Sequence, residues 1–221
     1  MIFKNSQDDI EFSFTKSVKN IGIKLSGGLD SAIVLYMLAK FVTEERPDIT
    51  IYPISCLADG KAFQQIFAKK VMDKITELTG VTYGTHYVTN IRADSAENYV
   101  GDMEAYVRDL YSKRCIQAHY VGVTANPGPN AAPALYDGKH ALPINNREKS
   151  LVKKTQRDGV SAFRPLVNID KKGVKELYKT LGVLNSIVPV TRSCEVFTNT
   201  FDYVCKDCWS CREKYWGFGH Y

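Results

Sequence analysis

The stretch IGIKLSGGLDSAIVLYML, at residues 21–38, constrains the fold of this chain more than any other feature. Residues 21–25 form a short apolar run that is typical of a buried strand, and residues 32–42 form an apolar run of helical length. The two glycines between them permit a tight turn and a close approach of the backbone to another group. The stretch therefore predicts a strand, a glycine loop and a helix in direct succession.

The loop differs from two well-known nucleotide-binding signatures. It lacks the lysine of the GxxxxGK[ST] loop, and it does not contain the GxGxxG pattern of dinucleotide-binding proteins. Backbone N–H groups at the start of a helix nevertheless favour an anion, and serine hydroxyls add further donors. The candidate anion-binding residues are Ser26, Gly27, Gly28, Leu29, Asp30 and Ser31. A tight turn without a ligand is the alternative. Asp30 can cap the next helix under either interpretation.

Strand and helix patterns alternate through the first half of the chain. Further strands are predicted at residues 50–57, 81–88 and 120–124, and further helices at residues 62–78 and 102–119. Pro53 weakens the first of these strand predictions, because proline cannot donate to a strand ladder. The alternation predicts an α/β fold with a parallel sheet between helices, in which ligands bind beyond the carboxyl ends of the strands.

Residues 125–150 interrupt this alternation. The segment holds four of the eight prolines of the chain and shows little periodicity. A loop of this length is typically functional or disordered, and we expect an active-site lid rather than a passive linker. Regular structure returns with a helix over residues 171–181, which Asp170 can cap at its start and Gly182 can end.

Four cysteines gather near the C-terminus in the pattern C-x10-C-x2-C-x2-C. They are Cys194, Cys205, Cys208 and Cys211. Four thiolates at this spacing suit a tetrahedral Zn²⁺ ion, which is structural in such a site because no coordination position stays open. An iron–sulfur cluster uses the same ligands and is the alternative. Disulfides are not expected, because the sequence shows no secretory signal.

The string SGGLDS resembles the SGGxDS signature of the PP-loop, or N-type, ATP pyrophosphatases. That resemblance implies an adenine nucleotide α-hydrolase-like (Rossmann-like) fold and a loop that grips the pyrophosphate end of ATP, with Mg²⁺ on the phosphates. The substrate then attacks the α-phosphorus, which releases pyrophosphate and leaves the substrate activated with AMP. We expect an ATP-binding α/β domain over residues 1–190 and a four-cysteine zinc-binding module over residues 191–221.

The C-terminal part of the chain resembles the 7-cyano-7-deazaguanine synthase (QueC) family. RPL at residues 164–166 corresponds to the TPL strand of that family, and Lys171 corresponds to a lysine at a helix start. Ser193 and Cys194 match an SC pair, and CWSCR at residues 208–212 matches CxSCR. The family's PGRN-like and DYSGYPDCR-like segments have no counterpart in the middle of this chain, so the resemblance leaves the substrate open.

This second resemblance implies an enzyme that adenylates a carboxylate on a deazapurine-like substrate. Ammonia then displaces AMP, giving an amide and, after a second activation, a nitrile. Asp30 and Lys171 are the expected catalytic residues. Asp30 orients the loop or positions Mg²⁺, while Lys171 reaches phosphate or is an ordinary surface lysine. The alternatives are the same ATP chemistry on another carboxylate or a tRNA base, and a zinc-stabilised nucleotide sensor without turnover.

The composition restricts the partners of such an enzyme. The net charge of +5 suits a nucleotide or another anionic small molecule, and it does not by itself indicate nucleic-acid binding. No apolar run approaches the roughly 20 residues of a membrane helix, and the N-terminal residues lack the apolar core of a signal peptide. We therefore expect a cytoplasmic protein with a small-molecule substrate and no membrane partner, and a homodimer is one oligomeric option.

Several chemically capable residues receive no catalytic role from the sequence. The four histidines, His86, His119, His140 and His220, are scattered and are not needed by a four-thiolate ion. Cys115 lies in a helical pattern and is expected to be buried, as free cysteines often are. Cys56 either packs in the core or touches adenine. The tail tryptophans Trp209 and Trp216 are expected to pack around the metal module, and stacking on nucleic-acid bases is the alternative.

Overall fold

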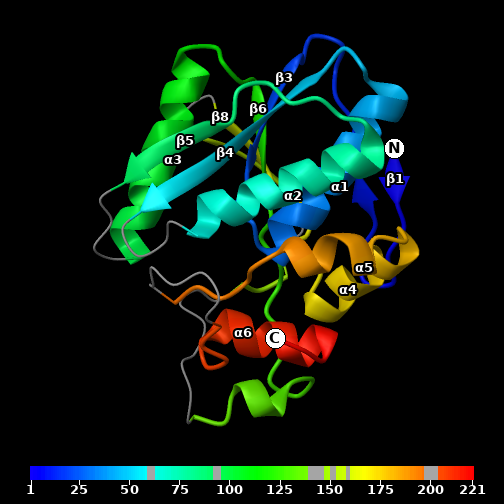
Figure 1. Ribbon diagram of the computed structural model, residues 1–221, viewed down its shortest axis with the longest axis vertical. Coiled ribbons are helices and arrows are strands. Elements are labelled where there is room, and N and C mark those ends of the chain that lie inside the picture. The colour runs from blue at the N-terminus through cyan, green and yellow to red at the C-terminus, as the bar shows by residue number, and fades with distance from the viewer. Residues whose placement is uncertain (59–62, 92–95, 139–146, 150–152, 158–159, 197–203) are drawn as a thin grey trace.

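The fold was analysed in a computed structural model, which describes residues 1–58, 63–91, 96–138, 147–149, 153–157, 160–196 and 204–221. Within these residues the strands form a six-stranded sheet and a separate antiparallel pair (Figure 1). The separate pair is β1 (Ile2–Phe3) and β2 (Ile10–Glu11). None of the described helices combines the length and the apolarity that a membrane crossing requires.

The six-stranded sheet is mostly parallel, as the alternating pattern predicts. Its strands are β3 (Asn20–Lys24), β4 (Thr50–Ala58), β5 (Tyr87–Ile91), β6 (Ala118–Val121), β7 (Lys154–Arg157) and β8 (Val160–Phe163). They lie in the order β5-β4-β3-β6-β8-β7. Every neighbouring pair is parallel except β7 and β8, which form an antiparallel edge. The predicted α/β fold class is thereby confirmed.

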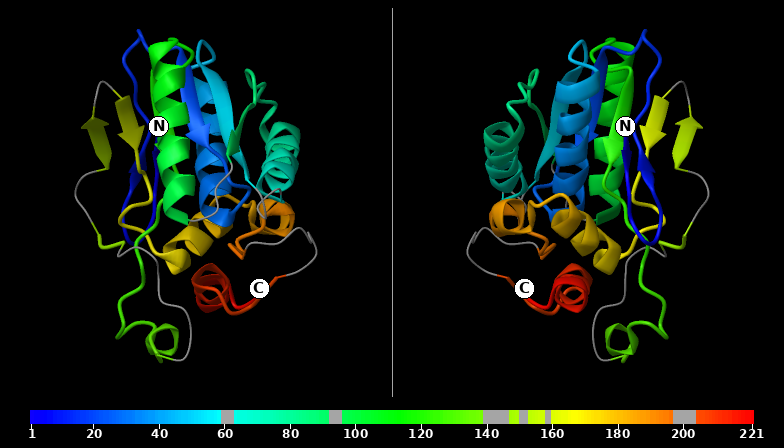
Figure 2. Two further views of the ribbon diagram at one scale, coloured as in Figure 1. Left: turned by 90° about the vertical axis from the view of Figure 1, so that its left-hand side faces the viewer. Right: turned by 90° about the vertical axis from the view of Figure 1, so that its right-hand side faces the viewer.

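Helices cover both faces of the sheet (Figure 2). The main core joins α1 (Leu29–Glu45) and α2 (Phe63–Thr79) to Ile21 and Ile23 of β3, while α3 (Ala96–Ser112) packs on Ile54 of β4 from the other face. The remaining helices are α4 (Lys171–Thr180), α5 (Leu184–Ile187), α6 (Trp209–Phe218) and the short 3-10 turns η1 (Pro133–Leu135) and η2 (Val188–Val190). In Figure 1, α6 and η1 lie together beyond one end of the sheet.

Two predicted boundaries in the middle of the chain are wrong. The helix predicted at residues 102–119 ends at Ser112, and its last residues belong to strand β6, which begins at Ala118. The helix ends through Arg114, whose φ of 57° is left-handed, a conformation that glycine normally signals in a sequence. Cys115 therefore follows the helix and is partly exposed rather than buried in it.

The strand predicted at residues 50–57 is confirmed as β4, whereas the next strand is shifted along the chain. The strand predicted at residues 81–88 starts only at Tyr87, after an isolated bridge between Ile51 and Tyr83. Pro53 does lie within the central strand β4, but the β4–β5 ladder begins one residue later, at Ile54. The ladder can therefore tolerate a proline there. The antiparallel strands β7 and β8 and the C-terminal helix α6 have no counterpart in the sequence prediction.

The connections of the sheet place the glycine loop at a topological switch point. The chain runs from β3 through α1 to β4 and through α2 to β5, and then returns through α3 to β6 on the other side of β3. In open α/β sheets the crevice at such a reversal, beyond the carboxyl ends of the strands, is where ligands bind. The loop at residues 25–28 follows β3 and Gly122 follows β6, so both lie at this crevice.

Candidate functional site

The glycine loop owes its shape to Gly27. This residue has a φ of 76°, and a Cβ atom added to it would lie 2.5 Å from Cβ of Phe67 and 2.6 Å from the backbone N of Ala68. Only glycine satisfies both the left-handed backbone and this contact with α2. Gly122 plays a similar part on the other side, because its added Cβ would lie 2.6 Å from the backbone N of Ser31.

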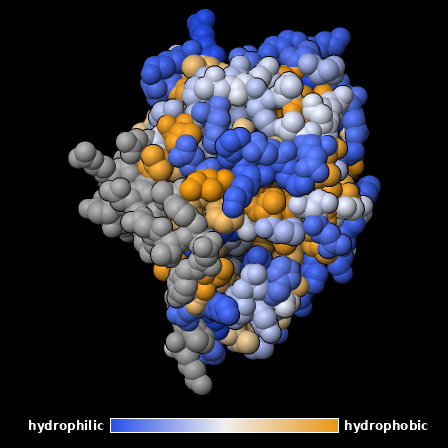
Figure 3. Space-filling view, viewed as in Figure 1, coloured by the Kyte–Doolittle hydropathy of each residue, from blue (hydrophilic) through white to orange (hydrophobic). Residues whose placement is uncertain are grey.

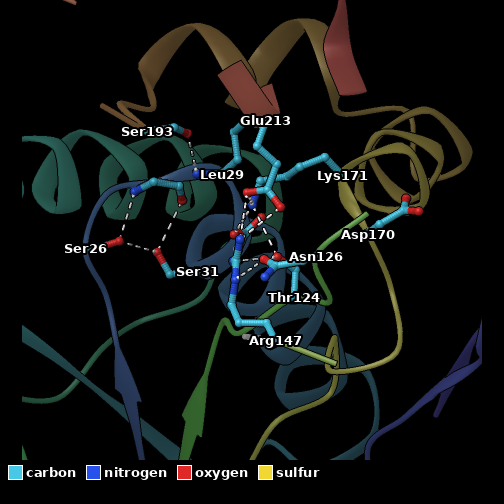
Figure 4. Close-up of polar contacts among 12 residues, drawn as sticks. Ser26, Leu29, Ser31, Thr124, Asn126, Arg147, Asp170, Lys171, Ser193 and Glu213 are labelled. Carbon is cyan, nitrogen blue, oxygen red and sulfur yellow. Dashed lines mark hydrogen bonds and ion pairs between the residues drawn. The ribbon is translucent and has the colours of Figure 1, made fainter. Parts of the chain in front are cut away.

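Short polar contacts hold the loop in place (Figure 4). Gly28 N–H donates to Oγ of Ser26 at 3.3 Å, Ser31 Oγ donates to the Gly28 carbonyl at 3.2 Å, and the two serine Oγ atoms are 3.2 Å apart. A distant segment adds two more contacts. Arg192 N–H donates to the Gly27 carbonyl at 2.9 Å, and Leu29 N–H donates to Ser193 Oγ at 3.5 Å. The helix N-cap is Gly28 and makes no side-chain cap, so Asp30 is free for another role.

Lys171 reaches Asp30 from the start of α4. Asp170 caps this helix by accepting from the N–H groups of Lys172 at 2.9 Å and Gly173 at 3.1 Å, as predicted. Lys171 is only 3% exposed, which rules out an ordinary surface lysine. Its Nζ forms an ion pair with Asp30 and lies 3.4 Å from Oγ1 of Thr124.

Glu213 and Arg147 complete a network of four charged side chains, of which Lys171 and Glu213 are buried and Asp30 and Arg147 are half-buried (Figure 4). Glu213, on α6, is 1% exposed and lies 3.5 Å from Nζ of Lys171. Nη2 of Arg147 donates to both carboxylate oxygens of Glu213 at 3.0 Å. Arg147 also donates to Oδ1 of Asn126 at 2.6 Å. Three distant parts of the chain therefore meet at the start of α1.

Charge pairing keeps both cations of the network protonated. Burial by itself lowers the pKa of Lys171, but Asp30 and Glu213 outweigh it, so the pKa lies above its ordinary value. For Arg147, burial again lowers the pKa, and Glu213 and Asp30 raise it further than burial lowers it. Since Lys171 and Glu213 are buried, removing one member of this network would be costly.

A cavity of about 230 Å³ opens over this network and the glycine loop. Its lining includes Ser26, Gly28, Leu29, Asp30, Ser31, Arg147, Lys171, Arg192, Ser193 and Glu213. Oδ1 of Asp30 is buried and has no hydrogen-bond partner among the described residues. A buried carboxylate oxygen without a partner is costly, and a cation or a hydrogen-bond donor would satisfy it. We refer to this space as the phosphate cavity.

A second cavity, of about 540 Å³, adjoins the phosphate cavity on the α3 face of the sheet. The two share Ser26, Ser31, Gly122 and Val123, and the second is further lined by Lys24, Glu104, Arg108, His119 and Arg164. Its volume lies in the range of pockets for small organic ligands. The serines of the glycine loop thus stand between a small polar cavity and a larger one.

The four predicted metal ligands come together. Their Sγ atoms all lie within 4.8 Å of one another, with 3.6 Å between Cys194 and Cys205 and 3.8 Å between Cys205 and Cys211. A tetrahedral ion with metal–sulfur bonds of about 2.3 Å separates its sulfurs by about 3.8 Å. Backbone N–H groups of Cys205 and Cys208 also point at sulfurs, at 3.5 Å and 3.2 Å. The cluster therefore fits one metal ion.

The cysteine cluster is directly connected to the phosphate cavity. Cys194 follows Arg192 and Ser193, whose contacts hold the glycine loop, and Cys211 lies on α6 two residues before Glu213. Gly217 lets α6 approach α4, since its added Cβ would lie 2.5 Å from Cβ of Lys171. The segments that hold the metal thus also position the loop and one of its buried charges.

The predicted lid at residues 125–150 is described only in part, since residues 139–146 and 150 lie outside the described residues. Its first part packs under α6, where Ala132 and Leu135 contact Trp209, and Nη1 of Arg212 donates to the Leu135 carbonyl at 3.4 Å. Trp209 therefore packs on this segment, and its described contacts are not with the metal ligands. Arg147, from the second part, enters the site.

Sequence reasoning missed Arg147, Arg192 and Glu213. Glu213 stands two residues after a predicted metal ligand, and Arg147 lies in the predicted lid, but neither position has a pattern of its own. Arg192 packs its guanidinium 4.4 Å from the ring centroid of Phe63 and lines the phosphate cavity. Only the fold brings these residues to the glycine loop.

The remaining candidates lie in different places. His119 is buried in the second cavity, and His86 Nε2 lies 2.8 Å from Oγ of Ser55. His220 is exposed, and His140 lies outside the described residues. Cys56 is buried in the core and also lines the second cavity.

Comparisons with known proteins do not assign the chain to a family. No protein-family model matches the chain, and none of the curated proteins matches it. Among solved structures, it is similar to the U34-tRNA thiolase NcsA from Methanococcus maripaludis with its [4Fe-4S] cluster, with a TM-score of 0.49 and 16% sequence identity. The similarity covers 76% of this chain and 59% of the thiolase chain, so the chain spans about three fifths of that protein's length.

Proposed function

We propose that the protein is a PP-loop-type enzyme that cleaves ATP between the α- and β-phosphates. The observation that carries this proposal is the lysine-free glycine loop at the switch point of the sheet, with Lys171, Arg147 and Arg192 around its cavity. The loop N–H groups and these cations would hold the pyrophosphate end of ATP. The adjoining cavity of about 540 Å³ would take the nucleoside end.

Each site residue has a distinct role in this proposal. Gly27 and Gly28 bring the backbone close to the phosphates, while Ser26 and Ser31 donate hydroxyl hydrogen bonds. Lys171 stays protonated and stabilises the negative charge that builds up on the departing pyrophosphate. Glu213 holds Lys171 and Arg147 in position, since it contacts both.

Asp30 fits a role in holding Mg²⁺. Its Oδ1 is buried without a hydrogen-bond partner in the described part of the chain, and carboxylate oxygens are ligands that Mg²⁺ prefers. Mg²⁺ would neutralise charge on the phosphates when bound. The ion pair with Lys171 fixes the direction of the Asp30 side chain, so its second oxygen stays available.

We assign the cysteine cluster to a structural Zn²⁺ ion. Sulfurs within 4.8 Å of one another suit four ligands on a single tetrahedral ion. In a four-iron cluster each thiolate binds a different iron atom, which places the sulfurs further apart.

The substrate we propose is a carboxylate on a deazapurine-like ring, with ammonia as the second reactant. The carboxylate oxygen attacks the α-phosphorus, the bond to pyrophosphate breaks, and an acyl adenylate forms. Ammonia then attacks the carbonyl carbon, and AMP leaves with the acyl C–O electron pair to give the amide. This assignment rests on the resemblance of the loop and of the tail at residues 193–212 to the deazaguanine synthases.

The test is turnover with defined reactants. Zinc-loaded protein is incubated with ATP, Mg²⁺, ammonium and 7-carboxy-7-deazaguanine, and AMP, pyrophosphate and the amide and nitrile are measured. We expect the wild type to form all of these products. In Lys171→Met the rate of pyrophosphate release should fall by at least about 100-fold. Lys172→Met is the matched control, since Lys172 is exposed and does not line the phosphate cavity.

Other outcomes distinguish the alternatives. Turnover with tRNA and none with the deazapurine would move the same ATP chemistry to an RNA base. ATP binding without pyrophosphate release under any of these conditions would indicate a nucleotide sensor rather than an enzyme. Iron in place of zinc in the purified protein would contradict the metal assignment.

A further inference from the structure

A third cavity, of about 700 Å³, lies outside the proposed ATP site. It is formed by α2, α4, α5, η2 and α6, and it is separated from the phosphate cavity by residues 192–194, which line both. Figure 3 shows apolar residues gathered across the middle of this side of the molecule, between the α/β part and α6. The proposed function assigns no role to this space.

The cavity is positively charged. Lys175, Lys179, Arg192 and Lys214 line it, and no aspartate or glutamate is among its described lining residues. The metal ligands Cys194 and Cys211 also line it, and the negative charge of a four-thiolate zinc site offsets only part of these four positive charges. This contrasts with the phosphate cavity, where Asp30 and Glu213 balance Lys171 and Arg147. Several cations in one concave, partly apolar space raise the local concentration of anions.

Lys214 gives independent support for a ligand. It is only 8% exposed, and no hydrogen bond or carboxylate ion pair joins its ammonium to a described residue. Burial lowers the pKa of Lys214, and the nearby Cys211 offsets part of that effect. Glu213, its neighbour in the chain, points instead to Lys171 and Arg147. A lysine that is largely removed from water and is paired with no described carboxylate loses hydration, and an anion in the cavity would compensate that loss.

The other walls suit an aromatic group. Phe67, Leu184, Val188 and Phe218 line the cavity, and Tyr221 stacks on Tyr215 at its edge with ring centroids 4.8 Å apart and an interplanar angle of 22°. A volume of about 700 Å³ is within the range of pockets that enclose small organic ligands. Cations beside aromatic rings match a phosphate beside a base.

We propose that this cavity is a second anion site, which binds the phosphate of a nucleotide at Lys214, Lys175 and Lys179 and its base against the aromatic wall. The nucleotide is either free or one unit of an RNA strand, because both present the same phosphate and base. This site is separate from the ATP site and does not depend on ATP turnover.

Isothermal titration tests the site directly. Zinc-loaded protein is first saturated with Mg²⁺ and α,β-methylene-ATP, so that the phosphate cavity is filled, and is then titrated with GMP, with guanosine, or with a short 5′-phosphorylated RNA. We expect GMP to bind at one site per chain, and guanosine to bind at least roughly 10-fold more weakly because it lacks the phosphate. Tighter binding of the RNA than of GMP would identify an RNA strand as the source, and the reverse would identify a free nucleotide.

Variants connect this binding to Lys214. Lys214→Gln should weaken GMP binding by roughly 10-fold or more, because a hydrogen bond to a charged group is lost. Lys172→Gln, on α4 but outside the cavity lining, should bind like the wild type. If Lys214→Gln does not fold with its zinc, the double variant Lys175→Gln and Lys179→Gln should show the same loss. Equal GMP binding in the wild type and in the cavity variants, or no binding of GMP and RNA at all, would overturn the proposal.

Discussion

The two glycines of the loop differ in how well they tolerate a side chain. Gly27 combines a φ of 76° with contacts of 2.5 Å to 2.6 Å for an added Cβ, whereas Gly28 has a φ of −85° and a nearest contact of 3.3 Å, to Oγ of Ser26. The sequence shows two adjacent glycines that look equivalent. Their difference depends on Phe67 and Ala68 of α2, which the local sequence cannot place.

Substitution of the two glycines by alanine tests this difference. We expect Gly27→Ala to lower the free energy of unfolding by about 1–3 kcal/mol or more, because of backbone strain and the contact with α2. Gly28→Ala should cost less than about 1 kcal/mol. Denaturant unfolding of both variants measures the difference. Equal losses in the free energy of unfolding would show that the close contact with α2 does not determine the conformation of the loop.

His119 gives a prediction about pH. Burial, with Lys24 nearby, lowers its pKa to about 4. Its Nδ1 lies 3.2 Å from Oη of Tyr111, which donates its proton to the Ser161 carbonyl at 2.6 Å. The folded protein therefore holds His119 neutral, while the unfolded chain protonates it below its ordinary pKa of about 6.5.

The sign of the effect follows from proton binding. Between pH about 6.5 and about 4 the unfolded chain binds more protons at His119 than the folded protein, so stability falls as the pH falls through this window. As the pH is lowered through this window, the free energy of unfolding should decline less steeply in His119→Gln than in the wild type. If the free energy of unfolding depends on pH in the same way in both proteins, His119 is not held neutral by burial.

At the scale of elements, the sequence predicts some segments better than others. The succession β3, glycine loop and α1 is clear, because apolar runs and glycines define it locally. The end of α3 is missed because Arg114, not a glycine, takes the left-handed position. Helix α6 is missed because its ten residues include polar side chains, among them Arg212 and Glu213, that are buried by contacts with distant segments.

The third prediction concerns the close contact between α4 and α6. A Cβ on Gly217 would lie 2.5 Å from Cβ of Lys171 and 2.9 Å from its carbonyl carbon. Gly217→Ala should therefore move α6 away from α4, lower the melting temperature, and reduce pyrophosphate release because Lys171 and Glu213 separate. Gly128→Ala is a suitable control, since its added methyl group meets nothing within 4 Å. Wild-type turnover in Gly217→Ala would show that this contact does not position Lys171.

At the scale of the whole molecule, the metal cluster and the phosphate cavity form one structure. Lys171, Glu213 and Arg147 come from positions between 24 and 66 residues apart in the chain, and they meet only when α4, α6 and the segment at residues 147–149 fold together. The sequence indicates the loop and the four cysteines through their spacing. It has no comparable signal for the charges that connect them.

Removal of the metal should therefore affect nucleotide binding. We expect chelation of zinc both to lower the melting temperature and to weaken binding of an ATP analogue. The reason is that the metal no longer holds residues 192–194 and α6 in place. Added zinc should restore both. Cys208→Ser should behave like chelated protein, whereas Cys115→Ser, a thiol outside the cluster, should keep its zinc. Unchanged binding of the analogue after chelation would show that the two sites are independent.

The central claim is that ATP is cleaved at the α-phosphorus, and the labelled products of turnover test it most directly. ATP labelled at the α-phosphate and, separately, at the γ-phosphate is incubated with the zinc-loaded protein, Mg²⁺, ammonium and either 7-carboxy-7-deazaguanine or tRNA. We predict that the α label appears in AMP and the γ label in pyrophosphate, in equal amounts and only when an acceptor is present. Formation of ADP and orthophosphate, or no labelled product with either acceptor, would contradict the account.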